Sequence, residues 1–261
     1  MRSCWILYDR SDLEINRFFA ESLCSHGRGM GLKTSVVVTD SIPDGIPDLV
    51  VSRTRDFQLT RSLEEGGSVV VNPSRVSEIC NDKVSTLEFA ESLGIPYLPY
   101  SVPDEPLPPG PPWVVKSRIG HGGTEVFMVR NESELAIVAG DLSERMPMIQ
   151  SVAPRLGADM RCYMSEGRLI ASVLRTSDSD FRANYKLGGE VGLCEPPEEA
   201  YGILKKVDEG LDADFIGVDF LFGNDGEVYL NEIEDVVGTR MLYKLTDMDP
   251  ALMIMEIVNG K

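Results

Sequence analysis

Short apolar runs alternate with amphipathic stretches through the first third of the chain. The runs are rich in Val, Ile and Leu and predict buried strands at residues 4–8, 34–40, 48–54 and 68–73. Between the first two, apolar residues recur at helical spacing from Leu13 to Cys24, and Gly27, Gly29 and Gly31 predict the end of that helix. Because strands alternate with helices, we expect a mainly parallel sheet.

The pattern changes beyond residue 77. A helix is predicted over residues 82–93, closed by Gly94, and it leads into a proline-dense stretch at 96–112 that predicts a stiff surface connection. Strand-like runs then dominate, with further helices predicted at 131–143 and 196–211. We therefore expect three units, an N-terminal α/β domain at 1–77, a central unit at 78–150 and a C-terminal unit at 151–261.

The stretch IGVDFLFGNDGEVYLNEIED near the C-terminus predicts a β-hairpin, because two apolar runs flank a Gly-Asn-Asp-Gly turn. Alternation places Glu232 and Glu234 on one face of the second strand with Leu230, and Asn231 on the other face. Asp219 lies between apolar neighbours, where a charge is costly unless it is paired or binds a cation. Three converging carboxylates suit Mg²⁺, and a ribbon with a solvated polar face is the alternative.

Two further clusters indicate anion binding. The run WVVK ends in Lys116 and precedes a turn with Gly120, Gly122 and Gly123, whose backbone N–H groups can approach phosphate oxygens. A plain turn is an equally good interpretation of these glycines. Farther along, guanidinium groups gather in an otherwise acidic chain, and we interpret them as an anion site rather than as surface ion pairs. The residues of this second cluster are Arg161, Arg175, Arg182, Asn184 and Lys186.

Composition removes several classes of function. The formal net charge of −17 argues against sequence-independent binding to nucleic acid and against docking on an anionic membrane. The chain has only two histidines, which excludes a histidine-rich metal site. Its five cysteines are scattered without a CxxC pair, and no run reaches transmembrane length or resembles a signal peptide, so we expect a reduced, cytoplasmic protein.

The order of these motifs resembles the ATP-grasp superfamily, most closely the RimK-like carboxylate–amine ligases. The order is NPSRVSEICNDK, GIPYLPY, WVVK with its glycine loop, IQSVAP, DMR, RTSDSDFRANYKLGG, GVDF and LNEIE. The resemblance covers residues 70–238 well and the first 69 only in general character. It implies an α/β (α+β) ATP-grasp fold, with an N-terminal parallel-sheet domain, a small lid subdomain and a C-terminal antiparallel-sheet subdomain.

The resemblance also implies roles for individual residues. It places the ATP phosphates near the two lysines, a mobile flap over the triphosphate, and adenine against a hinge strand. The implied nucleotide-binding residues are Lys83, Lys116, Gly120, His121, Gly122, Gly123, Gln150, Ser151, Val152 and Asp159. The implied phosphate- and substrate-facing residues are Arg161, Arg175, Arg182 and Asn184. Asp219, Glu232 and Glu234 would hold two Mg²⁺ ions, with Mn²⁺ as a substitute. Read from its place in the turn alone, His121 is an exposed turn residue rather than a catalyst.

The implied activity is ATP-dependent formation of an amide (peptide-type) bond through an acylphosphate, on small-molecule or peptide carboxylate and amine substrates. No nucleic acid or membrane partner is expected, and family members are often homo-oligomers. A kinase on the same scaffold, a non-catalytic ATP-binding protein and a structural protein without nucleotide stay open. Three departures from the family matter: Ser151 replaces Glu, Thr124-Glu125 replaces a glycine, and Glu234 replaces Asn as a metal ligand.

The substrate pocket is expected between the N-terminal domain and the arginine cluster. Arg53 and Arg55 follow a predicted strand there. They either face that pocket and bind a carboxylate or are simply solvated.

Overall fold

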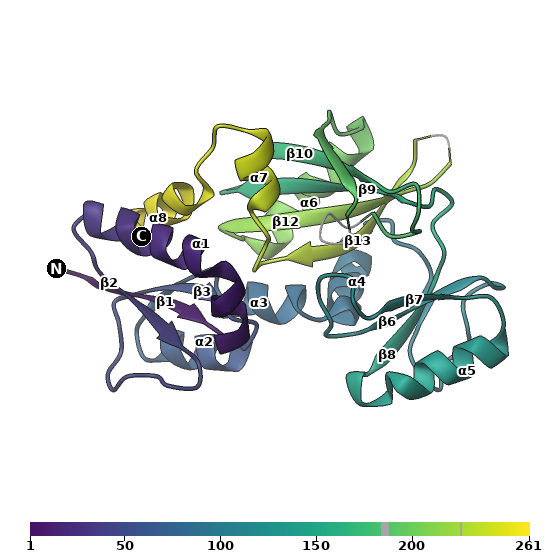
Figure 1. Ribbon diagram of the computed structural model, residues 1–261, viewed down its shortest axis with the longest axis horizontal. Coiled ribbons are helices and arrows are strands. Elements are labelled where there is room, and N and C mark those ends of the chain that lie inside the picture. Colours follow the sequence, from purple (N-terminus) through teal and green to yellow (C-terminus); the bar gives the residue numbers. More distant parts are fainter. Residues whose placement is uncertain (184–187, 225) are drawn as a thin grey trace.

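The computed structural model describes residues 1–183, 188–224 and 226–261, and within them the chain forms three β-sheets (Figure 1). The strand orders are β2-β1-β3-β4, β5-β8-β6-β7 and β11-β10-β9-β12-β13. The first sheet lies at the end of the molecule where both chain termini are found (Figure 1). The other two sheets lie at the opposite end and face each other (Figure 1). This arrangement confirms the predicted mixed α/β fold with a parallel N-terminal sheet and an antiparallel C-terminal sheet. The sheet between them in the sequence is antiparallel as well.

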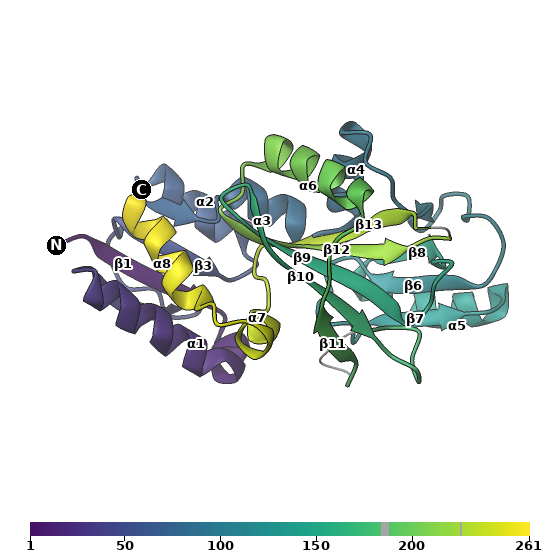
Figure 2. The ribbon, with the colours of Figure 1, turned by 90° about the horizontal axis from the view of Figure 1, so that it is seen from above.

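The first sheet is parallel and has helices on both faces. Its strands are β1 (Ser3–Tyr8), β2 (Lys33–Val38), β3 (Leu49–Arg53) and β4 (Val69–Val71). Because side chains alternate along a strand, Ile6 and Tyr8 pack into the core shared with α1 (Arg10–Gly29) and α8 (Pro250–Gly260). Trp5 and Leu7 point the other way, toward α2 (Phe57–Glu65). The last helix of the chain thus returns to the first sheet and lies beside α1 (Figure 2).

Helix α1 continues past Gly27, so the prediction that this glycine breaks the helix is wrong. A Cβ at Gly27 would come within 2.4 Å of the Thr34 side chain on β2 and 2.9 Å of Met255 on α8. The glycine therefore allows close packing of α1, and the helix instead ends at Gly29, before Gly31 with its positive φ of 83°.

Two short helices connect the first sheet to the rest, α3 (Ser74–Cys80) and α4 (Lys83–Ser92). The lid sheet follows, with β5 (Tyr100–Ser101), β6 (Trp113–Ser117), β7 (Val126–Val129) and β8 (Pro147–Ser151). Helix α5 (Glu132–Asp141) and a 3₁₀ turn (Ser143–Arg145) cover one face, where Trp113 and Val115 are buried. Alternation leaves Val114 and Lys116 on the other face, which points toward the C-terminal sheet.

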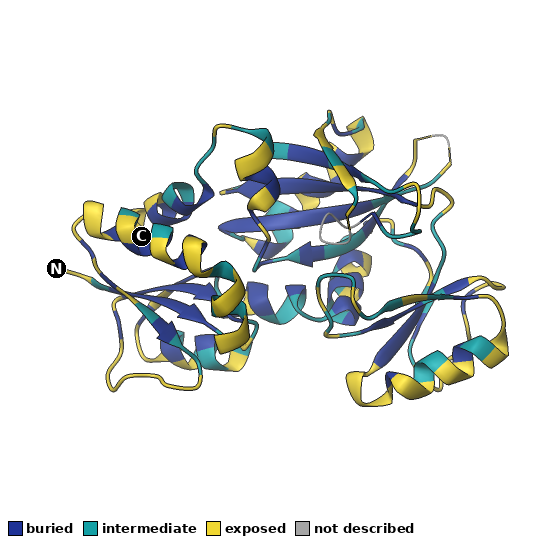
Figure 3. Cartoon of the chain, viewed as in Figure 1, coloured by how far each residue is buried: buried dark blue, intermediate teal, exposed yellow. Residues whose placement is uncertain are grey.

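The third sheet is antiparallel. Its strands are β9 (Ala158–Ser165), β10 (Arg168–Thr176), β11 (Glu190–Leu193), β12 (Phe215–Phe222) and β13 (Val228–Glu234). One face packs under α6 (Glu198–Leu211), with Met160 and Val218 in that core. The opposite face carries Arg161 and Asp219 at nearly complete burial. Most of the length of the central strands of this sheet is buried (Figure 3). Helix α7 (Arg240–Leu245) then leads back toward α8. In the ranges given above, no helix combines the length and apolar character needed to cross a bilayer.

The buried side chain of Asn72 joins the first sheet to the third. Its amide nitrogen donates to the carbonyl oxygens of Phe215 (2.8 Å) and Asp235 (3.3 Å). Its Oδ1 accepts from the backbone N–H groups of Asp214 and Phe215, both at 2.9 Å. One side chain thus satisfies four backbone groups at the start and end of the β12–β13 hairpin, which fixes the hairpin against the end of β4.

We expect Asn72→Ala to lower the free energy of unfolding by about 3 kcal/mol or more, because four buried backbone groups lose the side chain that bonds to them. Denaturant unfolding followed by circular dichroism measures the change. Asn259→Ala, at an exposed asparagine that accepts a bond from Arg2, is the matched control and should leave stability nearly unchanged. Equal effects of the two variants would contradict the role of Asn72 as the joint.

Candidate active site

Two adjoining cavities lie between the lid sheet, the C-terminal sheet and the N-terminal domain. The smaller, of about 110 Å³, lies between the open face of the lid sheet and the end of the C-terminal sheet. The larger, of about 540 Å³, reaches from the C-terminal sheet to β1, β3 and α1. The residues that line both are Lys83, Gly120, His121, Gly122, Asn231 and Glu232. The two cavities therefore meet beside the glycine-rich turn and strand β13.

Two lysines from different elements converge at this junction. Lys83 is the first residue of α4, whose N-cap Asp82 accepts from the N–H groups of Val84 and Ser85. Its ammonium lies 3.5 Å from a Glu232 carboxylate oxygen and donates to the carbonyl of Gly120 in the turn. Lys116 ends β6, and its Nζ donates to Asn231 Oδ1 at 3.1 Å.

Burial changes the acid–base properties of this pair. The pKa of Lys116 is lowered from 10.5 to about 8, mainly because burial desolvates the ammonium; Glu232 opposes the shift and nearby Lys83 adds to it. Burial alone would raise the pKa of Glu232, but Lys83 and Lys116 outweigh that effect and lower it. Two ammonium groups held beside a largely enclosed cavity are positioned to bind an anion such as a phosphate.

The position of Asn231 differs from the prediction based on alternation. Asp219 pairs with Glu232 across the hairpin, but the next residue, Phe220, pairs with Leu230, so Asn231 is the extra residue of a β-bulge. Leu230 therefore lies in the apolar core, not on the face of Glu232, and Asn231 lines the same cavities as Glu232. Strict alternation missed this, because the letters of the strand do not mark the bulge.

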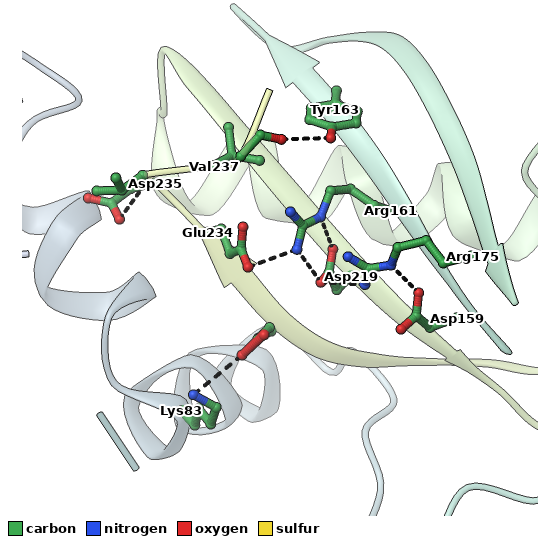
Figure 4. A network of polar contacts seen from close by, with 12 residues as sticks. Lys83, Asp159, Arg161, Tyr163, Arg175, Asp219, Glu234, Asp235 and Val237 are labelled. Atoms are coloured by element: carbon green, nitrogen blue, oxygen red, sulfur yellow. Dashed lines mark hydrogen bonds and ion pairs between the residues drawn. The ribbon is translucent and has the colours of Figure 1, made fainter. Parts of the chain in front are cut away.

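A buried ionic network occupies the inner face of the C-terminal sheet (Figure 4). Arg161 on β9 donates from Nε and Nη2 to the two carboxylate oxygens of Asp219 on β12, at 2.7 and 2.6 Å. Arg175 on β10 donates from Nη2 to Asp219 Oδ2 at 2.8 Å and from Nε to Asp159. Arg161 also forms an ion pair of 2.8 Å with Glu234. Arg161 and Arg175 of the predicted arginine cluster thus both line the larger cavity and pair with carboxylates.

The network shifts the pKa values of Asp219 and Glu234 in opposite directions. Desolvation would raise the pKa of Asp219, but Arg161 and Arg175 outweigh it and lower that pKa to about 2. Burial raises the pKa of Glu234, and Asp219 adds to the rise against the pull of Arg161. Asp219 therefore stays ionised. Glu234 is the carboxylate whose ionised form would be stabilised by an additional cation.

The three hairpin carboxylates fit a divalent cation. One ligand oxygen from each of Asp219, Glu232 and Glu234 can be chosen so that all lie within 4.8 Å of one another. An ionised carboxylate has about four lone pairs, and the bonds from Arg161 and Arg175 use three of those on Asp219, which leaves one on Oδ1. Glu232 and Glu234 are half-buried and lie at the cavity, and oxygen donors are what Mg²⁺ takes.

The glycine-rich turn is held from two sides. Arg182 donates from Nη1 to the carbonyl oxygens of Gly123 (2.9 Å) and Val126 (3.3 Å), and it pairs with Asp180 at 2.7 Å. Lys83 holds Gly120 from the other side. Two cations expected to meet phosphate thus contact the turn itself, which couples the position of the turn to that of the phosphate-binding groups.

The structure places every described residue of the predicted site on one or both cavities. Those on the smaller cavity only are Lys116, Gly123, Gln150, Ser151, Val152, Asp159 and Arg182. Those on the larger cavity only are Arg161, Arg175, Asp219 and Glu234. Asn184, like Lys186 of the same cluster, lies outside the described residues. Sequence reasoning missed Asn231, and it left Arg53 undecided, although Arg53 is buried in the wall of the larger cavity.

Comparison with known families decides the relationship. The model of the RimK-like ATP-grasp domain matches residues 108–258, more than half of the chain. The chain belongs to the RimK-like ATP-grasp family. A crystal structure of a RimK domain ATP-grasp protein from Sphaerobacter thermophilus superposes with a TM-score of 0.72 at 18% identity, covering 98% of this chain and 99% of that one. At this identity the match shows the fold alone.

Curated relatives align with most of the chain, including its N-terminal part. Protein MG011 of Mycoplasma genitalium is 26% identical and aligns with 98% of this chain and 91% of its own. Beta-citrylglutamate synthase B of Danio rerio is 29% identical over 88% of this chain, which spans 61% of that enzyme. A probable alpha-L-glutamate ligase of Methanococcoides burtonii is 27% identical over 89% of this chain and 79% of its own. The predicted family and the predicted class of activity, an ATP-dependent ligase that forms carbon–nitrogen bonds, are confirmed.

We expect Asp219→Ala to lower the free energy of unfolding by about 3–5 kcal/mol, because two buried arginines lose their shared counter-charge. The same change at Asp40, whose ion pair with Arg10 is exposed, should have almost no effect and serves as control. Urea unfolding measures both. Because the folded pKa of Asp219 is about 2, below the ordinary 3.8, the wild-type protein should keep this contribution at neutral pH and lose it only as pH falls from about 4 through 2. A stable Asp219→Ala variant would contradict the structural role.

Affinity for ATP should fall as pH rises above about 8, because Lys116 is charged below its pKa and neutral above it. The expected slope is roughly ten-fold per pH unit, since binding must then take up a proton. Lys116→Arg should keep its affinity through pH 9.5, because an arginine stays protonated. Calorimetric titration between pH 7 and 9.5 measures both, with Lys205→Arg on exposed α6 as control. A wild-type affinity that is flat across this range would contradict a binding role for the Lys116 charge.

Proposed function

We propose that this protein activates a substrate carboxylate with ATP and joins it to the amine of an amino acid, with glutamate as the first candidate. The observation that carries the proposal is the junction of the two cavities. The ammonium groups of Lys83 and Lys116 lie beside the cluster of three carboxylates at this junction. The smaller cavity would hold the nucleotide, and the larger cavity would hold the other substrates. The family binds ATP with Mg²⁺, and these are the groups that such a pair requires.

The smaller cavity suits the nucleotide. Lys83 and Lys116 would contact the phosphates, and Arg182 would join them from the far side of the turn. The backbone of residues 150–153 lines the opposite wall, while the Gln150 side chain is directed away and donates to Leu98 O at 3.2 Å. Adenine would thus meet strand-end backbone groups, and Ser151 in place of the family's Glu would leave the nucleoside without one carboxylate contact.

The hairpin carboxylates Asp219, Glu232 and Glu234 would hold Mg²⁺, and the resemblance to the family implies two ions. When bound, the metal neutralises charge on the transferring phosphoryl group. Glu234 in place of the family's Asn adds a negative charge, and Arg161 lies 2.8 Å from it. That ion pair offsets the extra charge within the protein, so the departure is compatible with a working metal site.

The reaction needs no covalent intermediate on the enzyme. A carboxylate oxygen of the first substrate attacks the γ-phosphorus of ATP, and the bond to the β,γ-bridging oxygen breaks, which gives an acylphosphate and ADP. The amine of the second substrate then attacks the acyl carbon, loses a proton and expels inorganic phosphate. Lys83, Lys116 and Arg182 would stabilise charge on the phosphoryl group, and the glycine-rich turn that Lys83 and Arg182 hold would exclude water.

Glutamate is proposed as the amine-bearing substrate because two relatives carry that specificity in their names. One is named a beta-citrylglutamate synthase and the other a probable alpha-L-glutamate ligase. A cavity of about 540 Å³ has room for an amino acid beside a second small substrate. In a chain of net charge −17, the arginines of its wall supply the attraction that an acidic substrate needs.

Phosphate release from ATP should require an acid and an amine together, and Glu232→Ala with Glu234→Ala should lower it at least about 100-fold, because the metal loses two of its three carboxylates. Coupled-enzyme assays of phosphate and ADP with paired acids and amino acids measure turnover. Calorimetry with and without Mg²⁺ measures nucleotide binding. Glu227→Ala, at an exposed glutamate of the same hairpin, is the control.

Three outcomes would overturn the proposal in different ways. Failure of ATP to bind with Mg²⁺ would remove the nucleotide site. ADP formation with a stable phosphorylated product and no phosphate release would make the protein a kinase. Tight ATP binding without turnover across the panel of substrates would make it a non-catalytic nucleotide-binding protein.

A further inference from the structure

The wall of the larger cavity farthest from the nucleotide is built by the N-terminal domain. Arg53 ends β3, and Tyr8 ends the neighbouring parallel strand β1, with the two residues directly paired in register. Both line the cavity, together with Phe19 of α1. The carboxyl ends of parallel strands therefore deliver a guanidinium and a phenol to the same point, opposite the carboxylates of β13.

Arg53 is only 7% exposed, and its partners do not use all its donors. Its Nη2 donates to the carbonyl oxygen of Val237 at 2.9 Å, and its guanidinium lies 5.3 Å from the ring centre of Phe19. Its Nε is buried without a hydrogen-bond partner, and so is the hydroxyl of Tyr8. Burial raises the pKa of Tyr8, although Arg53 opposes the shift, so the phenol stays neutral and can donate. The phenol oxygen can accept from the neighbouring guanidinium, which also opposes the rise in its pKa, but the Tyr8 O–H and the charge of Arg53 then still lack an acceptor. Leaving these groups buried is costly unless a ligand supplies that acceptor.

Three other arginines of this cavity, the buried Arg161 and Arg175 and the half-buried Arg55, already have carboxylate partners. Arg161 and Arg175 share Asp219, and Arg55 pairs with Asp12 at 2.6 Å. Among the described residues, Arg53 has no carboxylate at ion-pair distance. Asp235 is near enough for Arg53 and Arg55 to lower its pKa, but burial raises that pKa more, and its Oδ1 accepts from the Val236 N–H at 2.7 Å. Arg53 is thus the buried arginine of the wall that has a charge left to satisfy.

The chemistry of the proposed reaction supplies a matching anion. An amino acid that reacts through its amine keeps its α-carboxylate from binding to product release. That carboxylate is enclosed with the substrate, so it needs a permanent partner that lies away from the transferring phosphoryl group. We propose that Arg53 and Tyr8 bind the α-carboxylate of the amino acid that provides the amine. This assignment rests on the proposed function and names the recognition site for one of its substrates.

A purely structural role for Arg53 is the competing explanation. The bond to Val237 does tie β3 to the segment that follows β13. That role accounts for Nη2 and for the contact with Phe19, but it leaves Nε and the Tyr8 hydroxyl unpaired. A tether also gives no reason for both side chains to line a cavity of this size. The experiment therefore has to change the charge of the ligand as well as that of the residue.

The test measures binding of free amino acids and of their α-carboxamides to the full chain by calorimetry, in the presence of Mg²⁺ and a non-hydrolysable ATP analogue. L-Glutamate and its α-amide form the first pair, and the other common amino acids follow. The variants are Arg53→Gln, the charge-conserving Arg53→Lys, and Tyr8→Phe, which removes one oxygen and keeps the ring. Arg61→Gln is the matched control, because Arg61 lies in the same domain with its guanidinium 5.2 Å from the Phe57 ring, away from both cavities.

The wild type should bind the free acid at least about ten-fold more tightly than the amide. Arg53→Gln should lose that preference, Tyr8→Phe should weaken acid binding a few-fold, and Arg53→Lys should retain part of the preference. Arg61→Gln should match the wild type. Thermal unfolding and binding of the ATP analogue, measured on the same samples, should be unchanged in Tyr8→Phe, which keeps the test valid if Arg53→Gln folds poorly.

The outcomes against the proposal are distinct from failure of the ligase assignment. If the ATP analogue binds but wild type takes acid and amide equally, or takes no free amino acid, the carboxylate site is overturned while the nucleotide site stands. If Arg53→Gln and Tyr8→Phe both keep the wild-type preference for the acid, Arg53 is a tether only. Absence of Mg²⁺-dependent binding of the ATP analogue would instead remove the proposed function on which the site rests.

Discussion

The ion pairs of Asp219 are the interaction on which the arrangement of the active site depends. One buried carboxylate accepts from arginines on two strands, so β9, β10 and β12 are fixed relative to one another by charge as well as by backbone bonds. Burying Asp219 without these partners would be prohibitive, and burying either arginine without it would be equally costly. Each buried charge of the network is therefore stable only when its oppositely charged partners are present. The network also leaves one lone pair of Asp219 free, and a carboxylate oxygen of Asp219 lies within 4.8 Å of oxygens of Glu232 and Glu234.

Around that centre, opposite charges are divided between subdomains. The lid sheet and α4 supply Lys116 and Lys83, the C-terminal sheet supplies the carboxylates, and the two sets meet at the junction of the cavities. Each element has one apolar face in a core and one polar face toward the cleft, so ordinary strand alternation is enough to build both. The N-terminal sheet contributes in the same way, through the residues at the carboxyl ends of its parallel strands. Asn72 and Arg53 then tie that sheet to the hairpin, which places the substrate wall opposite the metal ligands.

The chain has a net charge of −17, but buried cations are concentrated in the cleft beside the carboxylates of the site. Most of the acidic side chains are solvated at the surface, whereas buried Lys116, Arg161, Arg175 and Arg53 concentrate positive charge inside. An anionic substrate is therefore repelled by most of the surface and attracted at the cleft. The departure at Glu234 fits this pattern, because Arg161 already pairs with the additional carboxylate. An additional charge in such a network is tolerated when a neighbouring residue of opposite charge pairs with it.

The sequence alone determined the class of fold, the strands and the ordered set of charged motifs. It did so because apolar periodicity, glycine turns and isolated charges in apolar runs are local signals, as at Asp219 and Lys116. Only the tertiary structure decided which of these groups meet. The β-bulge that brings Asn231 beside Lys116 is a property of strand pairing, and the role of Gly27 follows from the approach of β2 and α8. Arg53 shows most clearly what the sequence does not determine. An arginine at the end of a strand can be solvated or buried, and the local sequence does not distinguish the two cases. The burial of Arg53 and its unpaired Nε come from Tyr8, Phe19 and Val237, which folding brings together from distant parts of the chain.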